Sequence, residues 1–144
     1  MNFIQWSDEL MVNVPVIDQQ HKNMADILNA LYQTLGSGNE MKAKLLMKDL
    51  VEDVKIHFET EEDLMKNNQY LNFFSHKLEH DRFVKKAEEL NEQVQSGKLQ
   101  VNLEMMKSFK NWFYNHIDIN DKKMGDYLVL KGVADESVGE KVKS

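Results

Sequence analysis

The chain has 144 residues, of which 42% are hydrophobic, enough for one domain with a single core. Its 24 acidic and 18 basic residues give a formal net charge of −6, which disfavours a phosphate backbone as partner, so we expect no nucleic-acid binding. The chain contains no cysteine, which excludes disulfides, thiolate metal sites, iron–sulfur clusters and cysteine nucleophiles. Any bound metal must therefore be held by nitrogen and oxygen atoms.

The first nine residues lack the basic start and the continuous apolar stretch of a secretory signal. No stretch approaches the roughly 20 apolar residues that are needed to cross a bilayer. We therefore expect a cytoplasmic protein with no membrane insertion. Because the predicted helices use most of the apolar residues on their buried faces, we also expect a monomer.

An N-terminal arm, residues 1–16, precedes the first predicted helix. The arm is partly apolar through Phe3, Ile4, Trp6 and Val14. These side chains gain stability when they leave water, so we expect the arm to pack across the domain.

Four helices are predicted after the arm, because residues 39–96 and 98–124 contain neither proline nor glycine. Each helix has apolar residues at alternating spacings of three and four, which we call its seam. One helix alone cannot bury its seam, but four joined by short loops can do so in an antiparallel up-down-up-down bundle. The predicted fold class is therefore all-α. The helices cover roughly residues 18–35, 40–66, 71–95 and 102–119.

A short C-terminal segment follows the fourth helix. We predict that Met124–Leu130 forms either one short helix or an extended arm. Residues 132–144 are polar and charged, which is typical of a mobile tail. The bundle domain would then span residues 1–131.

The five histidines of the chain all fall on seam positions, which point toward the core. One histidine on an apolar helix face is more often a hydrogen-bonded core residue than a metal ligand. Ordinary core packing does not account for five of five, so the pattern indicates a metal site. The five are His21, His57, His76, His80 and His116.

Glu61 also lies on a seam, and no lysine or arginine shares that seam. A buried carboxylate is strongly unfavourable unless it is paired or binds a cation. His57 and Glu61 are four residues apart, hence about 40° apart around a helix, and His76 and His80 repeat this spacing. Each pair can therefore converge on one ion.

Asp121 follows His116 by five residues, which corresponds to about 140° around a regular helix, too far apart to share a site. The helix must therefore end or distort between the two residues. Asn120 and Asp121 are weak helix formers and Gly125 follows closely. We therefore expect the fourth helix to end here and the chain to bring Asp121 back under the bundle.

The candidate ligands are thus five imidazoles and two carboxylates. This set is too large for one tetrahedral zinc ion and too rich in nitrogen for magnesium or calcium. Two six-coordinate metals, bridged by both carboxylates and one oxygen, would use all seven side chains. One coordination position would remain vacant for a small molecule.

The chain resembles the hemerythrin family, in particular its bacterial single-domain members, the bacteriohemerythrins. The resemblance spans about residues 6–125, in the same order along the chain. The matching elements are Trp6-Ser7, Ile17 to Lys22, His57 to Glu61, His76 to His80 with Phe83, and Trp112 through His116-Ile117 to Lys123.

The resemblance implies a cofactor of two iron ions (Fe2+/Fe3+), bridged by Glu61, Asp121 and an oxo or hydroxo group. One iron would be held by His76, His80 and His116. The other would be held by His21 and His57, and dioxygen would bind end-on at its vacant position. By the same resemblance, the wall of the oxygen pocket includes Phe58, Phe83, Trp112, Phe113 and Ile117.

The implied function is reversible dioxygen binding for transport, storage or local supply, without catalysis. Five neutral imidazoles and a pocket without a proton donor favour binding over cleavage of the O–O bond. Three alternatives stay open: an oxygen or redox sensor that acts through a separate protein, a di-iron enzyme with peroxidase, nitric-oxide or iron-handling activity, and a metal-free bundle. Expected partners are dioxygen and an oxygen-accepting or signalling protein.

Overall fold

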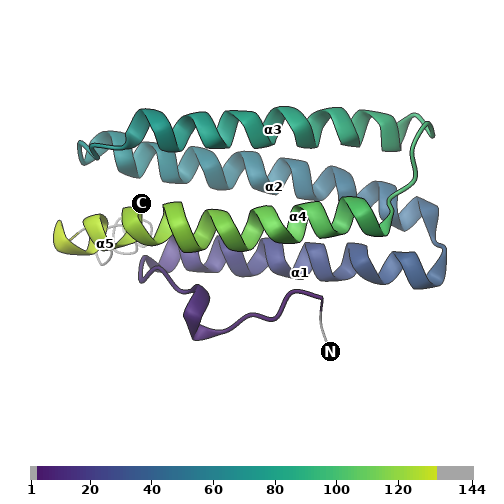
Figure 1. The fold of residues 1–144 in the computed structure, drawn as a ribbon, viewed down its shortest axis with the longest axis horizontal. Helices are drawn as coiled ribbons and strands as arrows, with labels where there is room; N and C mark the ends of the chain where they lie inside the picture. Colours follow the sequence, from purple (N-terminus) through teal and green to yellow (C-terminus); the bar gives the residue numbers. More distant parts are fainter. Residues whose placement is uncertain (1–2, 133–144) are drawn as a thin grey trace, which may run out of the picture.

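The computed structural model describes residues 3–132, and its regular elements within this range are all helical. Four long helices run alternately up and down and form an antiparallel bundle (Figure 1). This arrangement confirms the predicted fold class. The four helices are α1 (Pro15–Ser37), α2 (Glu40–Asn67), α3 (Phe73–Gln95) and α4 (Leu103–Asn115).

The helix ends follow from local sequence chemistry. Pro15 begins α1, where its fixed φ suits the first turn and its missing N–H is not needed. Gly38 ends α1 with a φ of 68°, and its N–H donates to the Thr34 carbonyl. Asn39 and Asn102 cap α2 and α4, because each side-chain oxygen accepts the backbone N–H three residues later. These caps produce the short connections that force neighbouring helices to run antiparallel.

The fourth helix does not end at Asp121, so that expectation is wrong. The chain continues from α4 through one π-helical segment, His116–Asp121 (η2), into a further helix, α5 (Lys122–Leu130). The distortion therefore widens the helix without ending it. The segment Met124–Leu130 is helical, whereas residues 133–144 of the predicted tail lie outside the described residues.

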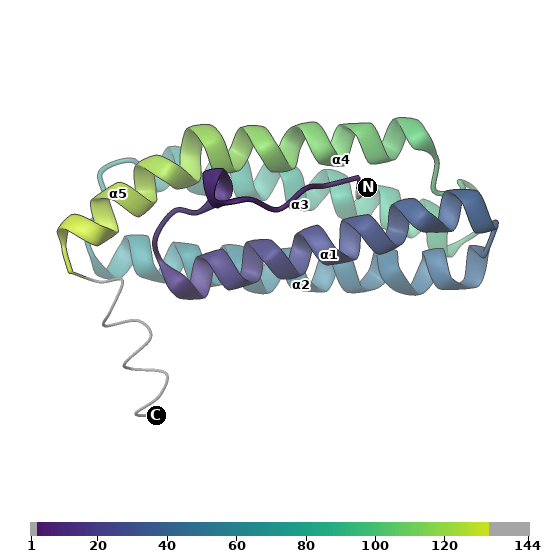
Figure 2. The same cartoon turned by 90° about the horizontal axis from the view of Figure 1, so that it is seen from below.

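The N-terminal arm packs along α1 and α4, as predicted (Figure 2). The arm contains a short 3-10 helix, η1 (Asp8–Leu10). Ile4 is buried, its N–H donates to Asn29 Oδ1 at 2.6 Å, and Asn29 Nδ2 donates to the Ile4 carbonyl at 2.9 Å. Further along the arm, Val12 lies very close to Gly125 of α5. A Cβ atom added to Gly125 would lie 2.5 Å from the Val12 carbonyl oxygen. The arm thus joins the two ends of the described chain.

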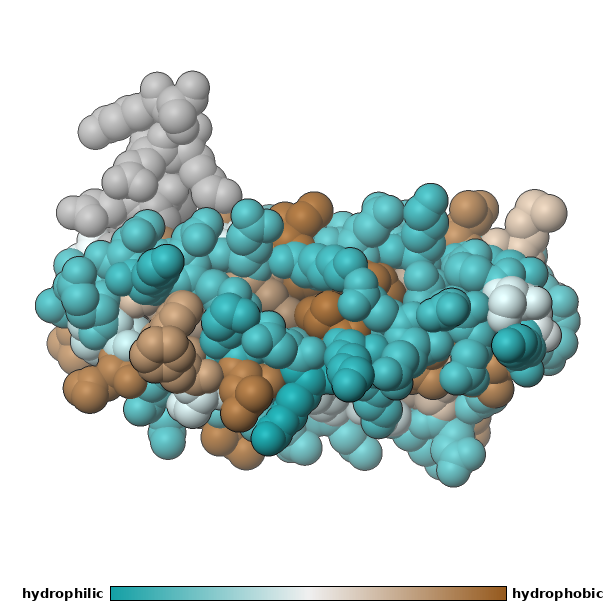
Figure 3. All heavy atoms as spheres, turned by 90° about the horizontal axis from the view of Figure 1, so that it is seen from above, coloured by the Kyte–Doolittle hydropathy of each residue, from teal (hydrophilic) through white to brown (hydrophobic). Residues whose placement is uncertain are grey.

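The interior of the bundle is apolar along most of its length, while the exterior is mainly hydrophilic. Figure 3 shows one face, where polar side chains dominate and apolar ones form scattered patches. Among residues 3–132, nine polar or charged side chains are buried, and all of them except Thr34 lie toward the end that carries α5 and the arm segment Val12–Asn13. Within residues 3–132, no helix is both long and apolar enough to span a membrane.

Candidate metal centre

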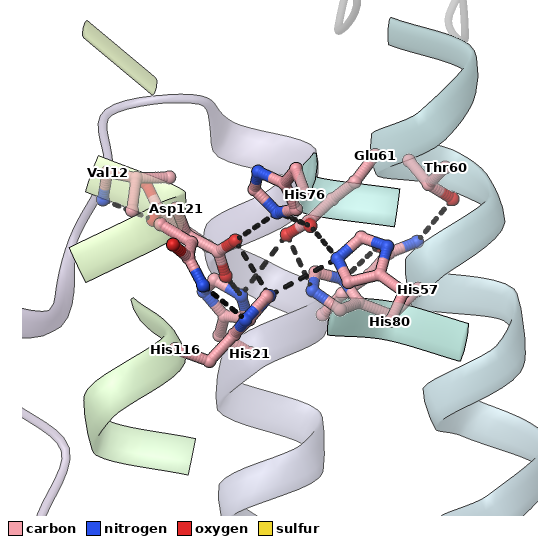
Figure 4. Close-up of polar contacts among 12 residues, drawn as sticks. Val12, His21, His57, Thr60, Glu61, His76, His80, His116 and Asp121 are labelled. Atoms are coloured by element: carbon pink, nitrogen blue, oxygen red, sulfur yellow. Dashed lines mark hydrogen bonds and ion pairs between the residues drawn. The ribbon is translucent and has the colours of Figure 1, made fainter. Parts of the chain in front are cut away.

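All seven predicted ligands come together at one end of the bundle (Figure 4). They lie near the start of α1, the end of α2, the start of α3 and within η2, and an up-down-up-down order places these four segments side by side. None is more than 4% exposed. The seven are His21, His57, Glu61, His76, His80, His116 and Asp121.

The π-helical segment η2 explains how His116 and Asp121 share one site. In a π-helix the hydrogen bonds join residues five apart, so such residues lie one turn apart on the same face. The His116 Nε2 atom accordingly lies 3.1 Å from Asp121 Oδ1. The widened turn therefore places two residues that are five apart on the same face, which a regular α-helix does not do.

The two oxygens of Glu61 face different histidines. Its Oε1 atom lies 3.2 Å from His76 Nε2 and 3.0 Å from His80 Nε2. Its Oε2 atom lies 2.8 Å from His57 Nε2 and 3.5 Å from His21 Nε2. Glu61 is therefore placed between two groups of histidines.

The two oxygens of Asp121 also face different histidines. Its Oδ1 atom lies 3.0 Å from His76 Nε2 and 3.1 Å from His116 Nε2, while its Oδ2 atom lies 2.9 Å from His21 Nε2. The cluster thus consists of two overlapping donor groups that share both carboxylates. The three-histidine group contains His76, His80 and His116, and the two-histidine group contains His21 and His57.

The donor atoms fit a pair of metal ions. Eight buried side-chain nitrogen and oxygen atoms of the cluster have no hydrogen-bond partner. Each such atom costs about 1–3 kcal/mol if it stays unsatisfied. The N···O separations of 2.8–3.5 Å also match neighbouring ligands on a metal with bonds of about 2.1 Å. All of these atoms except His21 Nδ1 belong to donor groups of five and four residues, which bound metals would satisfy together with the Nε2 atoms of His80 and His116.

Without metal, protons hold the cluster together. Burial alone would lower the pKa of His21 and His76, but the carboxylates of Asp121 and Glu61 raise both to about 9. Burial favours the neutral form of Glu61, yet the surrounding histidines hold its pKa well below the ordinary value. Burial and Glu61 oppose the ionisation of Asp121, but His116 and His21 lower its pKa. Metals that bind here must therefore displace protons from histidines.

The outward-facing Nδ1 atoms of three ligands have polar partners. Each partner is the sequence neighbour of one ligand but contacts a different ligand, because adjacent helical residues point about 100° apart. These partners were not predicted, and their only signal in the sequence is a polar residue beside a candidate ligand. The pairs are Gln20 with His57 at 2.8 Å, Glu62 with His80 at 2.9 Å and Asn120 with His116 at 3.2 Å.

Aromatic rings stack on the three-histidine group. The ring of Phe58 lies parallel to His80, with centroids 3.8 Å apart. Trp112 lies nearly parallel to His116 at 4.7 Å, and Phe83 stacks on Trp112 at 3.7 Å. Phe58 and Trp112 therefore support ligand rings directly, and Phe83 supports Trp112.

The other two predicted pocket residues are fully buried. The rings of Phe113 and His21 are nearly perpendicular, with centroids 6.2 Å apart, so Phe113 lies beside the two-histidine group. Ile117 directly follows the ligand His116 within η2.

A further buried carboxylate, Asp18, ties the arm to the helix that carries His21. Its two oxygens accept the backbone N–H groups of Val12 at 2.7 Å and of Asn13 at 3.1 Å. Asn13 has a φ of 67°, which places the chain in a sharp turn before α1. Asp18 therefore fixes the arm and leaves the ligand set to the other residues.

Known proteins match this chain over nearly its full described length. Residues 12–128 match the family model described as the hemerythrin HHE cation binding domain. A bacteriohemerythrin from Methylococcus capsulatus is 33% identical over 129 residues, which cover 89% of this chain and 98% of that protein. A bacteriohemerythrin from Clostridium acetobutylicum is 31% identical, with 84% and 98% covered. A crystal structure of wild-type hemerythrin superposes with a TM-score of 0.84 at 31% identity, with 88% and 98% covered. The chain belongs to the hemerythrin family.

Proposed function

We propose that this protein binds dioxygen reversibly at a pair of iron ions, for oxygen transport, storage or local supply. The observation that carries the proposal is the division of both carboxylates between the two histidine groups. Glu61 and Asp121 each offer one oxygen to the three-histidine group and the other to the two-histidine group. Carboxylates that join two metals need this arrangement.

The ligand assignment follows from the same geometry. His76, His80 and His116 would hold one iron, and His21 and His57 the other, with both carboxylates shared. When bound, the iron pair supplies the electrons for reversible binding of dioxygen. The two-histidine group offers four donors against five in the other group, so it leaves more room for a small ligand.

The residues around the cluster keep water out. Phe113 borders the two-histidine group, and Phe58 lies close to both His57 and His80, at ring-centroid distances of 5.8 Å and 3.8 Å. Both phenylalanines are almost fully buried. A dry apolar wall opposes the release of charged oxygen species, since unpaired charge is costly in a low-dielectric interior. The pocket wall would in this way favour release of neutral dioxygen.

The buried groups also favour binding over catalysis. Among residues 3–132, every buried carboxyl or imidazole group except Asp18 belongs to the ligand set. Both oxygens of Asp18 already accept backbone N–H groups. General acid–base catalysis needs a free group within reach of the substrate. A binding role, in line with a family of oxygen-binding proteins, therefore fits the site best.

The test is an optical titration of the anaerobically reduced, iron-loaded protein. We expect a visible absorption band that rises when oxygen is admitted and vanishes when oxygen is removed. Glu61→Gln should show no such band, whereas the exposed neighbour Glu59→Gln on the same helix should behave like the wild type. A wild-type protein that holds no iron, or that changes once and does not return, would overturn the proposal in favour of a metal-free bundle or an enzyme.

A further inference from the structure

The two histidine groups differ in what lies behind their rings. The Nδ1–H of His57, in the two-histidine group, donates to the neutral amide oxygen of Gln20 at 2.8 Å. The Nδ1–H of His80, in the three-histidine group, donates to a carboxylate oxygen of Glu62 at 2.9 Å. Within the described chain, Glu62 is the one carboxylate that hydrogen-bonds to an outward-facing ring nitrogen of a ligand.

Glu62 is fixed by contacts that lead from the cluster to the surface. It directly follows Glu61 on α2, and its side chain is 21% exposed. While Oε2 accepts from His80, Oε1 lies 3.9 Å from Lys77 Nζ on α3. Lys77 donates to both oxygens of Asp81, at 3.1 Å and 2.9 Å. A line of alternating charges thus joins His80 to the solvent.

A carboxylate behind a ligand histidine has two effects. It accepts the Nδ1 proton, which fixes the tautomer whose Nε2 lone pair faces the metal. Its negative charge also makes the ring a stronger donor, which favours a more highly charged metal ion. The amide of Gln20 can supply the first effect to His57 but not the second.

We propose that Glu62 is a positioning residue that tightens metal binding at the three-histidine position and favours the ferric over the ferrous ion there. The inference rests on the proposed function, because it concerns the same cluster. It adds a functional difference between the two metal positions that the ligand count alone does not give. Removal of the charge of Glu62 should weaken one position and leave the other nearly unchanged.

The first test is an anaerobic titration of the metal-free protein with Co2+, followed by absorption and by metal content per chain. For the wild type we expect two binding steps. Glu62→Gln keeps a hydrogen-bond acceptor but removes the charge, and should weaken the tighter step about 10–100-fold. Glu59→Gln removes the same charge from an exposed position on α2 and should match the wild type.

These outcomes separate the two claims. A wild-type chain that binds no metal overturns the proposed function together with this inference. A wild-type chain that binds two ions, with Glu62→Gln equal to Glu59→Gln, overturns the inference alone. Equal weakening of both steps in Glu62→Gln also overturns it, because a general disturbance of the fold would then explain the loss.

The second test uses the sign of a redox shift. In iron-loaded protein, Glu62→Gln should raise the reduction potential, because the ferric state loses a nearby negative charge. Lys77→Gln should lower it, because Glu62 loses its positive neighbour, and by less, since the Lys77 side chain is 41% exposed and screened. A merely structural role predicts shifts of the same sign in both variants. The proposal would be contradicted if the reduction potentials of the two variants shifted with the same sign, or if neither shifted.

Discussion

The two ends of the bundle are built from the same four helices but contain opposite kinds of core. At the end away from the cluster, Leu31, Met47, Val94 and Met105 from the four helices form an apolar interior. At the other end the same helices place imidazoles and carboxylates inside. Apolar burial stabilises the fold by about 25 cal/mol per Å², whereas buried polar atoms without partners destabilise it. Folding therefore depends chiefly on one end and metal binding on the other.

The sharpest way to test this division is Glu61→Gln. The change removes one of the two carboxylate charges that both histidine groups share, so we expect loss of both metals, a larger effect than substitution of an outer residue. The metal-free protein should still fold, because the surrounding histidines can release their protons and become neutral. Metal content after gel filtration and the free energy of unfolding measure the two effects. A variant that keeps two metals per chain would show that Glu61 is not a shared ligand.

The matching change at the apolar end is Leu31→Ala. Leu31 is fully buried, so its truncation should lower the free energy of unfolding by about 2–5 kcal/mol. Because Leu31 does not contact the cluster, the metal content per chain should stay at the wild-type value. Chemical denaturation with and without metal checks both expectations. A loss of metal from folded Leu31→Ala protein would mean that the two ends are coupled.

The pH dependence of metal binding should distinguish the ends as well. The raised pKa values of His21 and His76, about 9 each, mean that both are protonated at pH 7 in the metal-free protein. Metal must displace at least these two protons, so affinity should rise about a hundredfold per pH unit toward pH 9 and then level off. The carboxylates of Glu61 and Asp121 are already ionised, so they release no protons when metal binds.

The same groups affect the stability of the metal-free protein in the opposite direction. A raised histidine pKa stabilises the fold fully below the unfolded value of about 6.5, and this contribution is lost as the pH rises through about 9. Calorimetric titration with metal, in buffers of different ionisation enthalpy, counts the protons that metal binding releases. Leu31→Ala should release as many protons as the wild type. Binding without proton release would contradict the charged state of the cluster.

Much of the fold and of the cluster was predictable from the sequence because both depend on a local pattern. Spacings of three and four defined the four helices, so the histidines on those seams had to face the interior of a bundle, and the up-down-up-down order brings them to the same end. The pairs His57–Glu61 and His76–His80 needed only regular helix geometry. Their convergence in the structure follows from that geometry.

The unpredicted features depend on contacts between distant segments. The sequence requires the helix to end or to distort between His116 and Asp121, but it does not decide between the two. The π-helical turn of η2 is disfavoured locally, and it is held where Asp121 joins the cluster and α5 packs against the arm. Glu62 resembles any exposed helix carboxylate until α3 places His80 beside it. Asp18 lies beside the seam, and its role depends on a turn at Asn13 that brings backbone N–H groups to it. Such contacts cannot be predicted from the helical periodicity of the sequence.

Two glycines, one toward each end, provide the smallest and most specific test of the comparison. Gly125 at the metal end has no room for a side chain, since a Cβ would lie 2.5 Å from the Val12 carbonyl oxygen and 2.9 Å from its Cβ. Gly36, near the end of α1, has no atom within 4 Å of the same position and lies in a regular helix. The same substitution should therefore have opposite signs at the two positions.

Gly125→Ala should destabilise the protein by about 1–3 kcal/mol, because backbone or arm must move. Gly36→Ala should stabilise it by up to about 1 kcal/mol, because alanine loses less freedom in a helix. Thermal unfolding measures both, and limited proteolysis reports whether Gly125→Ala releases the arm at Val12. Gly125→Ala could instead be as stable as the wild type, with its arm still protected from proteolysis. The close approach of the arm and α5 would then not hold the metal end together, and the buried contacts of Asp18 with the arm would do so alone.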